Sequence, residues 1–234
     1  MIIEQYTSVR ATPELIGRED ILKDIHDAIN SKSDKPHVFY ITAPGGWGKT
    51  RLLDDVLKKL KVDEKGAWSS SKILSASRLV DLYHTYTHNE EGVIADIVEV
   101  LDHHDDNFSN YVRQYTELDH VKYDLSQILR AVTQQRARMI EAFISDFNDI
   151  GKSYDKIVLA FDTVENLVYE IDRVQDALGL ADEPIGVAGW MVKSFLPKIS
   201  NAVVLIAGRP ESPQLEDELR KLEEAKEIKF TLIK

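Results

Sequence analysis

The sequence contains no cysteine among its 234 residues. Disulfide bridges and thiolate metal sites are therefore excluded, and the composition is compatible with a reducing compartment. No apolar run approaches the roughly 18–20 residues of a membrane-spanning helix. The first ten residues also lack the basic segment and apolar core of a secretory signal. We therefore expect a cytoplasmic protein with no membrane partner.

Basic side chains are outnumbered in this chain. Its 29 Lys and Arg residues stand against 40 Asp and Glu residues, which gives a formal net charge of −11. A broad nucleic-acid-binding face needs clustered Lys and Arg, so this balance argues against nucleic acid as a partner. A nucleotide pocket is not excluded, because a few placed groups and Mg²⁺ are enough to hold a polyphosphate.

Glycine is scarce, with 11 residues, yet three of them fall in the stretch 43–50, which reads APGGWGKT. This stretch follows the apolar run His37–Thr42 and opens a segment with helical periodicity, the context of a phosphate-binding loop. Glycines let the loop curl so that several backbone N–H groups point at one anion. Lys49 can then reach the β- and γ-phosphates, and the Thr50 hydroxyl can ligate Mg²⁺. The alternative is a Gly-rich turn before a helix, and Ala43 does replace the first glycine of the usual pattern.

Two continuous apolar runs, Lys156–Asp162 and Ala202–Ala207, are typical of strands covered on both faces of a parallel sheet. The first run ends in an acid, and Arg209 lies just past the second. Ligands of such sheets bind at the carboxyl ends of the strands. We therefore expect the glycine-rich loop, Asp162 and Arg209 to converge on one pocket.

Each of these polar residues has a functional and a structural interpretation. Asp162 can bind Mg²⁺ beside Thr50 as a Walker B acid, or it can simply cap a strand. Glu165 can orient or deprotonate an attacking water, or it can complement a helix N-terminus. We consider Glu165 because the position directly after Asp162, where an acid that activates water would be expected, holds Thr163. Arg209 can stabilise or report a γ-phosphate, or it can be a solvated loop residue.

The remaining periodicity predicts strands alternating with helices, hence a doubly wound sheet with helices on both faces. A second strand is expected within Ile73–Tyr83, best over Arg78–Tyr83, and a last strand over Ile228–Ile233. A mostly helical block separates the second and third strands. The predicted helices cover 21–29, 52–60, 91–101, 111–119, 125–150, 190–196 and 215–225.

With these residues assembled, the chain resembles the nucleotide-binding domain of the STAND family, P-loop signal-transduction ATPases related to AAA+ proteins. Five stretches carry the resemblance: LIGRED, the Walker A loop APGGWGKT, RLVDLYHTYTHNEEG, the Walker B stretch IVLAFDTVENL and VVLIAGRPE. The resemblance implies a three-layer α/β/α sandwich with a five-stranded, mainly parallel sheet in the order 5-1-4-3-2. The first residues carry no clear period, so we expect an N-terminal arm over 1–14, followed by a P-loop NTPase core over 15–234.

The resemblance also implies a set of site residues. Asp162 would serve Mg²⁺ together with Thr50, Glu165 would act on the water, and Arg209 would contact the γ-phosphate. Lys49 would join these three as a catalytic residue. The implied nucleotide-binding residues are Ile16, Gly17, Arg18, Pro44, Gly45, Gly46, Trp47, Gly48, Lys49, Thr50 and Arg51.

The expected function is therefore a regulatory switch that binds ATP or ADP with Mg²⁺ and hydrolyses ATP slowly. Family members use the nucleotide to control conformation and self-association, and they carry lid, sensor and effector domains beyond the NTPase core. We accordingly expect the chain to be the core of a larger protein, with self-association and those domains as partners. A non-hydrolysing ADP- or ATP-binding assembly module is the main alternative. A small-molecule kinase fits less well, because no arginine-rich lid is evident.

Overall fold

The computed structural model of the chain describes residues 17–61, 65–101, 107–123, 128–165, 186–210 and 213–234. Within these ranges six strands form one sheet in the order β2-β4-β5-β1-β6, with β3 also paired to β4. All of these pairings are parallel. The predicted α/β class is therefore confirmed. The predicted arm over 1–14 and the candidate residue Ile16 lie outside the described residues.

The centre of the sheet consists of the three strands that the apolar runs predict. They are β1 (His37–Thr42), β4 (Lys156–Asp162) and β5 (Ala202–Gly208), and nearly all of their residues are buried. Continuous burial follows from helices packing on both faces, as parallel sheets require. β6 (Lys229–Ile233) pairs with the outer side of β1. Numbered by the predicted strands, the observed order is the expected 5-1-4-3-2.

The second predicted strand differs in its extent. It is not continuous over Arg78–Tyr83 but consists of two short pieces, β2 (Ile73–Ser75) and β3 (Val80–Asp81). Between them the chain leaves the sheet, and the Ser77 amide donates to the Val100 carbonyl at 2.9 Å instead of to a strand. The Arg78 side chain, predicted to lie in the strand, forms two hydrogen bonds to buried Asp96, at 2.7 and 3.2 Å. This charge-assisted pair connects the segment between the two strand pieces to the helix Glu90–Leu101.

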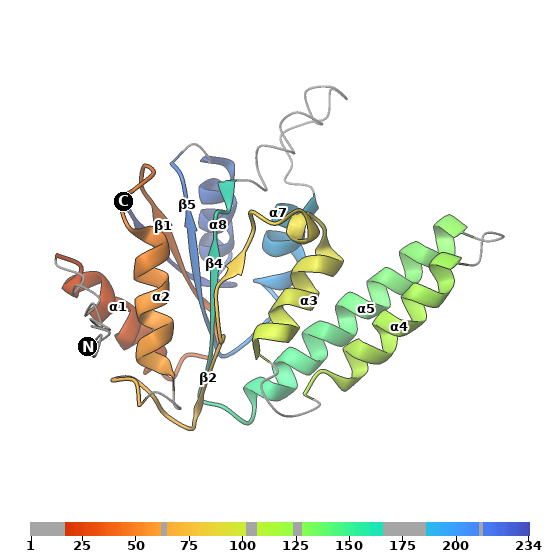
Figure 1. Cartoon of the computed structure of the whole chain (residues 1–234), viewed down its shortest axis with the longest axis horizontal. Helices are drawn as coiled ribbons and strands as arrows, with labels where there is room; N and C mark the ends of the chain where they lie inside the picture. The colour runs from red at the N-terminus through yellow and green to blue at the C-terminus, as the bar shows by residue number, and fades with distance from the viewer. Residues whose placement is uncertain (1–16, 62–64, 102–106, 124–127, 166–185, 211–212) are drawn as a thin grey trace, which may run out of the picture.

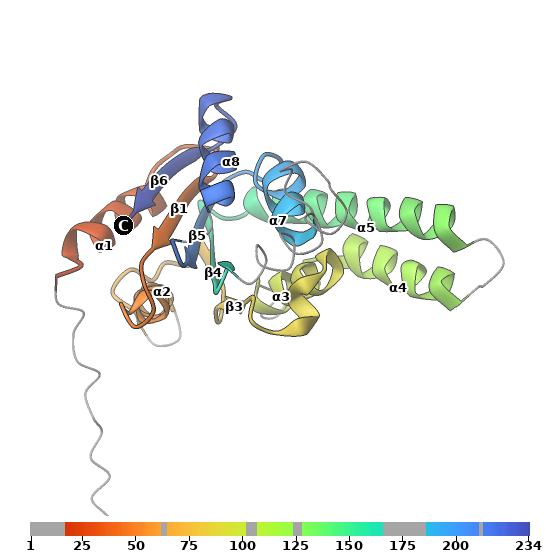
Figure 2. The ribbon, with the colours of Figure 1, turned by 90° about the horizontal axis from the view of Figure 1, so that it is seen from above.

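Helices cover both faces of the sheet, which gives three layers (Figures 1 and 2). The apolar stripe of α2 (Lys49–Leu60) is buried against the strands, with Leu52, Leu53, Val56, Leu57 and Leu60 inside. The helix predicted over 190–196 is instead a short α-helix followed by a π-helical turn. One face carries α1 (Glu19–Ile29) and α2 (Lys49–Leu60), and the other carries α8 (Pro213–Glu224), α7 (Gly186–Trp190) and the turn η2 (Met191–Phe195).

The predicted helical block lies between β3 and β4. It contains η1 (Thr85–His88), α3 (Glu90–Leu101), α4 (Ser109–Tyr123) and α5 (Ile128–Gly151), and α4 is longer than the predicted 111–119. α4 and α5 lie side by side and extend away from the sheet (Figures 1 and 2). An aromatic cluster anchors this helical hairpin to the body through Phe108, Tyr111, Phe143, Phe147, Trp190 and Phe195.

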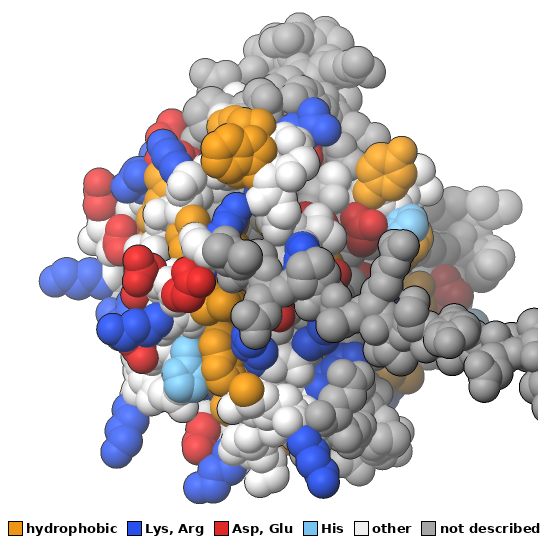
Figure 3. All heavy atoms as spheres, turned by 60° about the vertical axis from the view of Figure 1, so that its left-hand side comes forward, with side chains coloured by type: hydrophobic (Ala, Val, Ile, Leu, Met, Phe, Trp, Pro, Cys, Tyr) orange, Lys and Arg blue, Asp and Glu red, His pale blue; other side chains and the backbone are white. Residues whose placement is uncertain are grey.

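Two observations concern the expected absence of membrane and nucleic-acid partners. Within the described residues, no helix is long and apolar enough to span a membrane. On the face that carries α1 and α2, basic and acidic side chains are interspersed rather than gathered by sign (Figure 3).

Candidate functional site

The glycine-rich loop joins the carboxyl end of β1 to the first residue of α2. Gly46 and Gly48 have φ values of 82° and 77°, a left-handed conformation that a Cβ would strain. Gly48 directly precedes Lys49, where α2 begins. The first amides of a helix have no acceptors within the helix, and the helix dipole places positive partial charge there. The sequence thus forms the curled loop and helix N-terminus that suit an anion.

The Lys49 side chain folds back over its own loop. Its Nζ donates to the Ala43 carbonyl at 2.5 Å and to the Pro44 carbonyl at 3.2 Å. Lys49 is half-buried, whereas Pro44, Gly45 and Gly46 are exposed. The ammonium group is therefore held at the loop by two neutral acceptors, which an anion could replace.

The end of β4 meets the start of α2 through Asp162. The Thr50 hydroxyl donates to Oδ2 of Asp162 at 2.6 Å, and the Thr163 amide donates to Oδ1 at 2.9 Å. Asp162 is buried, with 8% of its surface exposed. Thr163 has a φ of 63°, an unfavourable conformation for a β-branched residue. Such strain is concentrated at functional sites, and here it directs the amide at the carboxylate.

The Thr50 hydroxyl and the Asp162 carboxylate fit Mg²⁺ as ligands. A hydroxyl and a carboxylate oxygen are hard donors, and Mg²⁺ is usually held by one or two carboxylates together with substrate phosphates and water. No cluster of three or more His, Cys, Asp or Glu side chains suited to a metal occurs among the described residues. Asp162 and Thr50 thus match a magnesium site that is completed by a phosphate, not one built wholly from protein.

Glu165 and Arg209 form an ion pair next to the loop. Nε of Arg209 lies 3.3 Å from Oε1 of Glu165; the glutamate side chain is 11% exposed and the arginine side chain 54% exposed. Nη2 of Arg209 lies 3.9 Å from where a Cβ on Gly45 would be. Asp162, Glu165 and Arg209 therefore all gather at the edge of the sheet where the loop lies, as the strand ends predict.

The entry segment also contacts the loop. Nη2 of Arg18 donates to the Trp47 carbonyl at 2.7 Å, which connects the start of α1 to the loop. The Trp47 side chain is 63% exposed. Arg51 is exposed on the first turn of α2, and Gly17 is exposed before α1. The structure therefore brings the described members of the predicted set to one region. Among the described residues, the exposed side chains of Trp47 and Arg51 make no polar contact.

Sequence reasoning missed the part that Gly208 plays. A Cβ at this position would lie 2.5 Å from Cγ1 of Val164 and 3.4 Å from Oε2 of Glu165. The Val164 amide also donates to the Ala207 carbonyl at 3.1 Å. The segment after Asp162 can approach β5 only because this residue has no side chain. The signal in the sequence was a glycine between a buried apolar run and Arg209.

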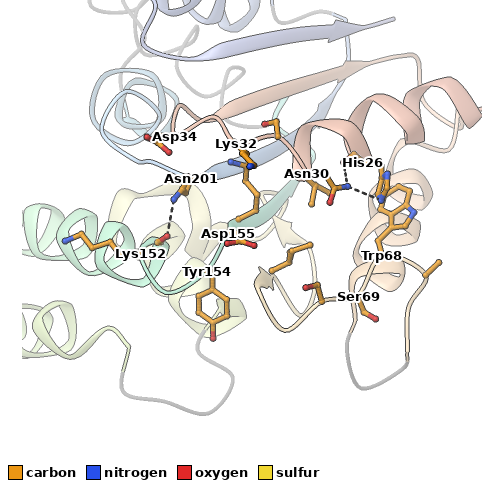
Figure 4. Close-up of a pocket in the computed structure, with 17 residues that line it drawn as sticks. His26, Asn30, Lys32, Asp34, Trp68, Ser69, Lys152, Tyr154, Asp155 and Asn201 are labelled. Atoms are coloured by element: carbon orange, nitrogen blue, oxygen red, sulfur yellow. Dashed lines mark hydrogen bonds between the residues drawn. The ribbon is translucent and has the colours of Figure 1, made fainter.

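A hollow with a volume of about 680 Å³ lies at the opposite edge of the sheet from the glycine-rich loop (Figure 4). Its labelled wall residues include Trp68, whose ring lies 4.8 Å from that of His26. Lys156 also lines it; burial lowers the pKa of this amine, and its Nζ donates to the Ser33 carbonyl at 2.6 Å. None of the predicted site residues lines this hollow. Its lining mixes both charge signs and points to no particular ligand.

Comparison with known proteins adds little to this geometry. No protein-family model matches the sequence, and no curated protein matches it. A structure of the Aeropyrum pernix ORC2 protein in ADPNP–ADP complexes aligns with a TM-score of 0.45 and 14% sequence identity. The alignment covers 94% of this chain and 48% of that chain, so this chain spans about half the length of that protein. The fold and the site therefore rest on the geometry of the chain itself.

Proposed function

We propose that this chain binds ATP or ADP with Mg²⁺ at the carboxyl edge of its sheet. The observation that carries the proposal is the loop before α2, where two left-handed glycines precede a helix N-terminus and Lys49 lies over the loop. The β- and γ-phosphates would exchange for the Ala43 and Pro44 carbonyls as partners of the ammonium. Anion binding at this place draws on the loop amides, the helix dipole and the lysine charge together.

Thr50 and Asp162 would hold the magnesium ion. The hydrogen bond of 2.6 Å between them places both oxygens at the end of the loop. Bound there, Mg²⁺ would neutralise phosphate charge. The residues Gly17 and Arg18 would border the base; the preference for adenine is inferred from the resemblance to STAND ATPases.

Slow hydrolysis of ATP is the second part of the proposal. Glu165 would accept a proton from a water whose oxygen attacks the γ-phosphorus, while the bond to the β–γ bridging oxygen breaks and ADP leaves. Arg209 would stabilise charge on the transferred phosphoryl group. In this interpretation the chain is the switch domain of a STAND-type regulatory ATPase, with the nucleotide biasing its conformation and self-association.

A non-hydrolysing nucleotide-binding module is the alternative. It is favoured by Thr163, which stands where an acid directly after Asp162 would activate water most simply. Under this alternative the nucleotide would be an assembly ligand, and Glu165 would serve only as the partner of Arg209.

Phosphate release under multiple turnover separates the two possibilities. We expect the wild type to turn over slowly with MgATP, and Glu165→Gln to lose turnover while it retains nucleotide binding. Glu224→Gln, at an exposed position of α8, is the matched control and should turn over normally. Turnover of Glu165→Gln at the wild-type rate would remove the catalytic role from Glu165. Binding without turnover in the wild type would favour the assembly module.

A further inference from the structure

We propose that Arg209 has two competing partners: the Glu165 carboxylate, as the structure shows, and the terminal phosphate of a bound nucleoside triphosphate. On this account a triphosphate must break the Arg209–Glu165 ion pair in order to bind fully, whereas a diphosphate leaves the pair intact. The inference rests on the proposed nucleotide site and adds a rule for how that site tells ATP from ADP.

The two members of the pair differ in their freedom to move. The glutamate side chain is 11% exposed and the arginine side chain 54% exposed, with 3.3 Å between Oε1 and Nε. A buried carboxylate is fixed by the packing around it, and a half-exposed arginine retains rotamer freedom. Arg209 is therefore the member that can change partners.

Arg209 already lies next to the place where a phosphate would bind. Its Nη2 approaches to 3.9 Å from where a Cβ on Gly45 would be, while its Nε faces Glu165. A guanidinium group carries five N–H donors in a rigid plane and binds carboxylates and phosphates in the same way. A side-chain rotation alone would therefore carry it from the carboxylate to an anion at the loop.

Loss of Arg209 has a cost for Glu165. Its Oε2 is buried and has no hydrogen-bond partner among the residues that the structure describes. When Arg209 leaves, the largely buried Glu165 carboxylate loses its charged partner, which is unfavourable. This cost lowers the affinity for a triphosphate and not for a diphosphate, because only the γ-phosphate competes for Arg209. A ligand shifts a two-state equilibrium only through such differential interactions.

Calorimetric titration with Mg²⁺ and either ADP or the non-hydrolysable β,γ-imido analogue of ATP tests this inference. The proteins are the wild type, Glu165→Gln, Arg209→Ala and the double variant. Glu165→Gln should bind the imido analogue about tenfold more tightly, with its affinity for ADP unchanged. A tenfold change lies within the range of coupling energies found between residues in direct contact. Arg209→Ala should lower the affinity for the imido analogue and leave the affinity for ADP unchanged. In the Arg209→Ala background, the gain from Glu165→Gln should shrink to about threefold or less, because no ion pair remains to be broken.

Glu165→Asp provides a second test that keeps the negative charge. The shorter side chain draws the carboxylate away from Arg209, so competition for the guanidinium predicts tighter binding of the imido analogue. Simple charge repulsion predicts no change. This variant also keeps the inference testable if Glu165→Gln does not fold, which thermal unfolding would show. Glu216→Gln, which breaks the exposed pair with Arg220 on α8, should leave both affinities unchanged.

Three results would count against the competition. If Glu165→Gln raised the affinity for the imido analogue equally in the wild-type and Arg209→Ala backgrounds, the gain would come from long-range charge and not from the ion pair. An equal gain for ADP would show that the γ-phosphate is not involved, and no gain for Glu165→Asp would contradict partner exchange. Failure of the nucleotide site itself would look different, because the folded wild type would then give no isotherm with either nucleotide.

Discussion

The Thr50 hydroxyl donates a hydrogen bond of 2.6 Å to Oδ2 of Asp162, across 112 positions of sequence. The other carboxylate oxygen accepts the Thr163 amide at 2.9 Å. Both oxygens of Asp162 are thus oriented by the protein, so the two proposed magnesium ligands stand together at the end of the loop. Preorganised ligands of this kind lose little entropy when they bind an ion.

Asp162→Asn should uncouple nucleotide binding from magnesium. The asparagine carbonyl can still accept from the Thr163 amide while its NH₂ group donates to the Thr50 hydroxyl, but the side chain supplies no charge to the ion. We therefore expect the gain in ATP affinity that Mg²⁺ produces to be at least about tenfold smaller than in the wild type. Titrations with Mg²⁺ and with EDTA measure this increment. Asp81→Asn is the matched control, since Asp81 lies beside Asp162 in register but its Oδ1 accepts the Tyr83 amide in a turn. An unchanged magnesium increment in Asp162→Asn would remove this residue from the metal site.

Thr163→Gly should stabilise the fold. The residue has a φ of 63°, where glycine is relaxed and a β-branched side chain is strained. We expect the free energy of unfolding to rise by about 1 kcal/mol, measured by chemical denaturation. Thr163→Ala loses the same hydroxyl but keeps a Cβ, so it should gain much less. Equal stabilities of the glycine and alanine variants would argue that the backbone there is not strained.

Gly208→Ala should destabilise the protein. The new Cβ would lie 2.5 Å from Cγ1 of Val164, so the segment that carries Glu165 must move. Overpacking of this kind costs about 1–3 kcal/mol. Gly151→Ala is the control, because its nearest contacts would be at 3.8 Å. Thermal unfolding compares the two, and tolerance of alanine at 208 would mean that this close approach is easily relieved.

His37 should make stability depend on pH in the acid range. Burial lowers its pKa to about 4 from the ordinary 6.5, and its Nε2 lies 2.9 Å from the Thr231 hydroxyl. Because the folded pKa is the lower one, the unfolded chain binds more protons between these values. Stability is therefore lost as pH falls from about 6.5 to 4.

Between pH 7 and pH 4.5, the free energy of unfolding of His37→Gln should fall by about 1–2 kcal/mol less than that of the wild type. This figure is reduced to allow for the partial exposure of the ring. Denaturation curves of both proteins at pH 7 and pH 4.5 measure the difference. Parallel losses of stability in the two proteins would assign the acid sensitivity to other groups.

Much of the fold could be predicted because its signals are local. Continuous apolar runs gave the positions of β1, β4 and β5, and the leucine stripe after Thr50 gave α2. The split of the second strand could not be predicted, because the contact between Arg78 and Asp96 that accompanies it forms only in the folded protein. The π-helical turn after Trp190 has the same apolar pattern as an ordinary helix.

The candidate site likewise has a part that the sequence predicts and a part that it does not. Strand ends predicted that Asp162 and Arg209 would share an edge with the loop, since parallel strands end together. The particular pairings depend on tertiary packing, as in the contact of Arg209 with Glu165 and that of Arg18 with the Trp47 carbonyl. The left-handed conformation of Thr163 was also invisible, because its sequence gives no sign of positive φ.

The central claim is that the loop before α2 binds a polyphosphate with the help of Lys49. Calorimetric titration of MgATP into the wild type, Lys49→Ala and Lys58→Ala tests it most directly, because Lys58 is an exposed lysine on the same helix. The account predicts binding to the wild type and to Lys58→Ala, and no measurable binding to a folded Lys49→Ala. Equal affinity of all three proteins would contradict it.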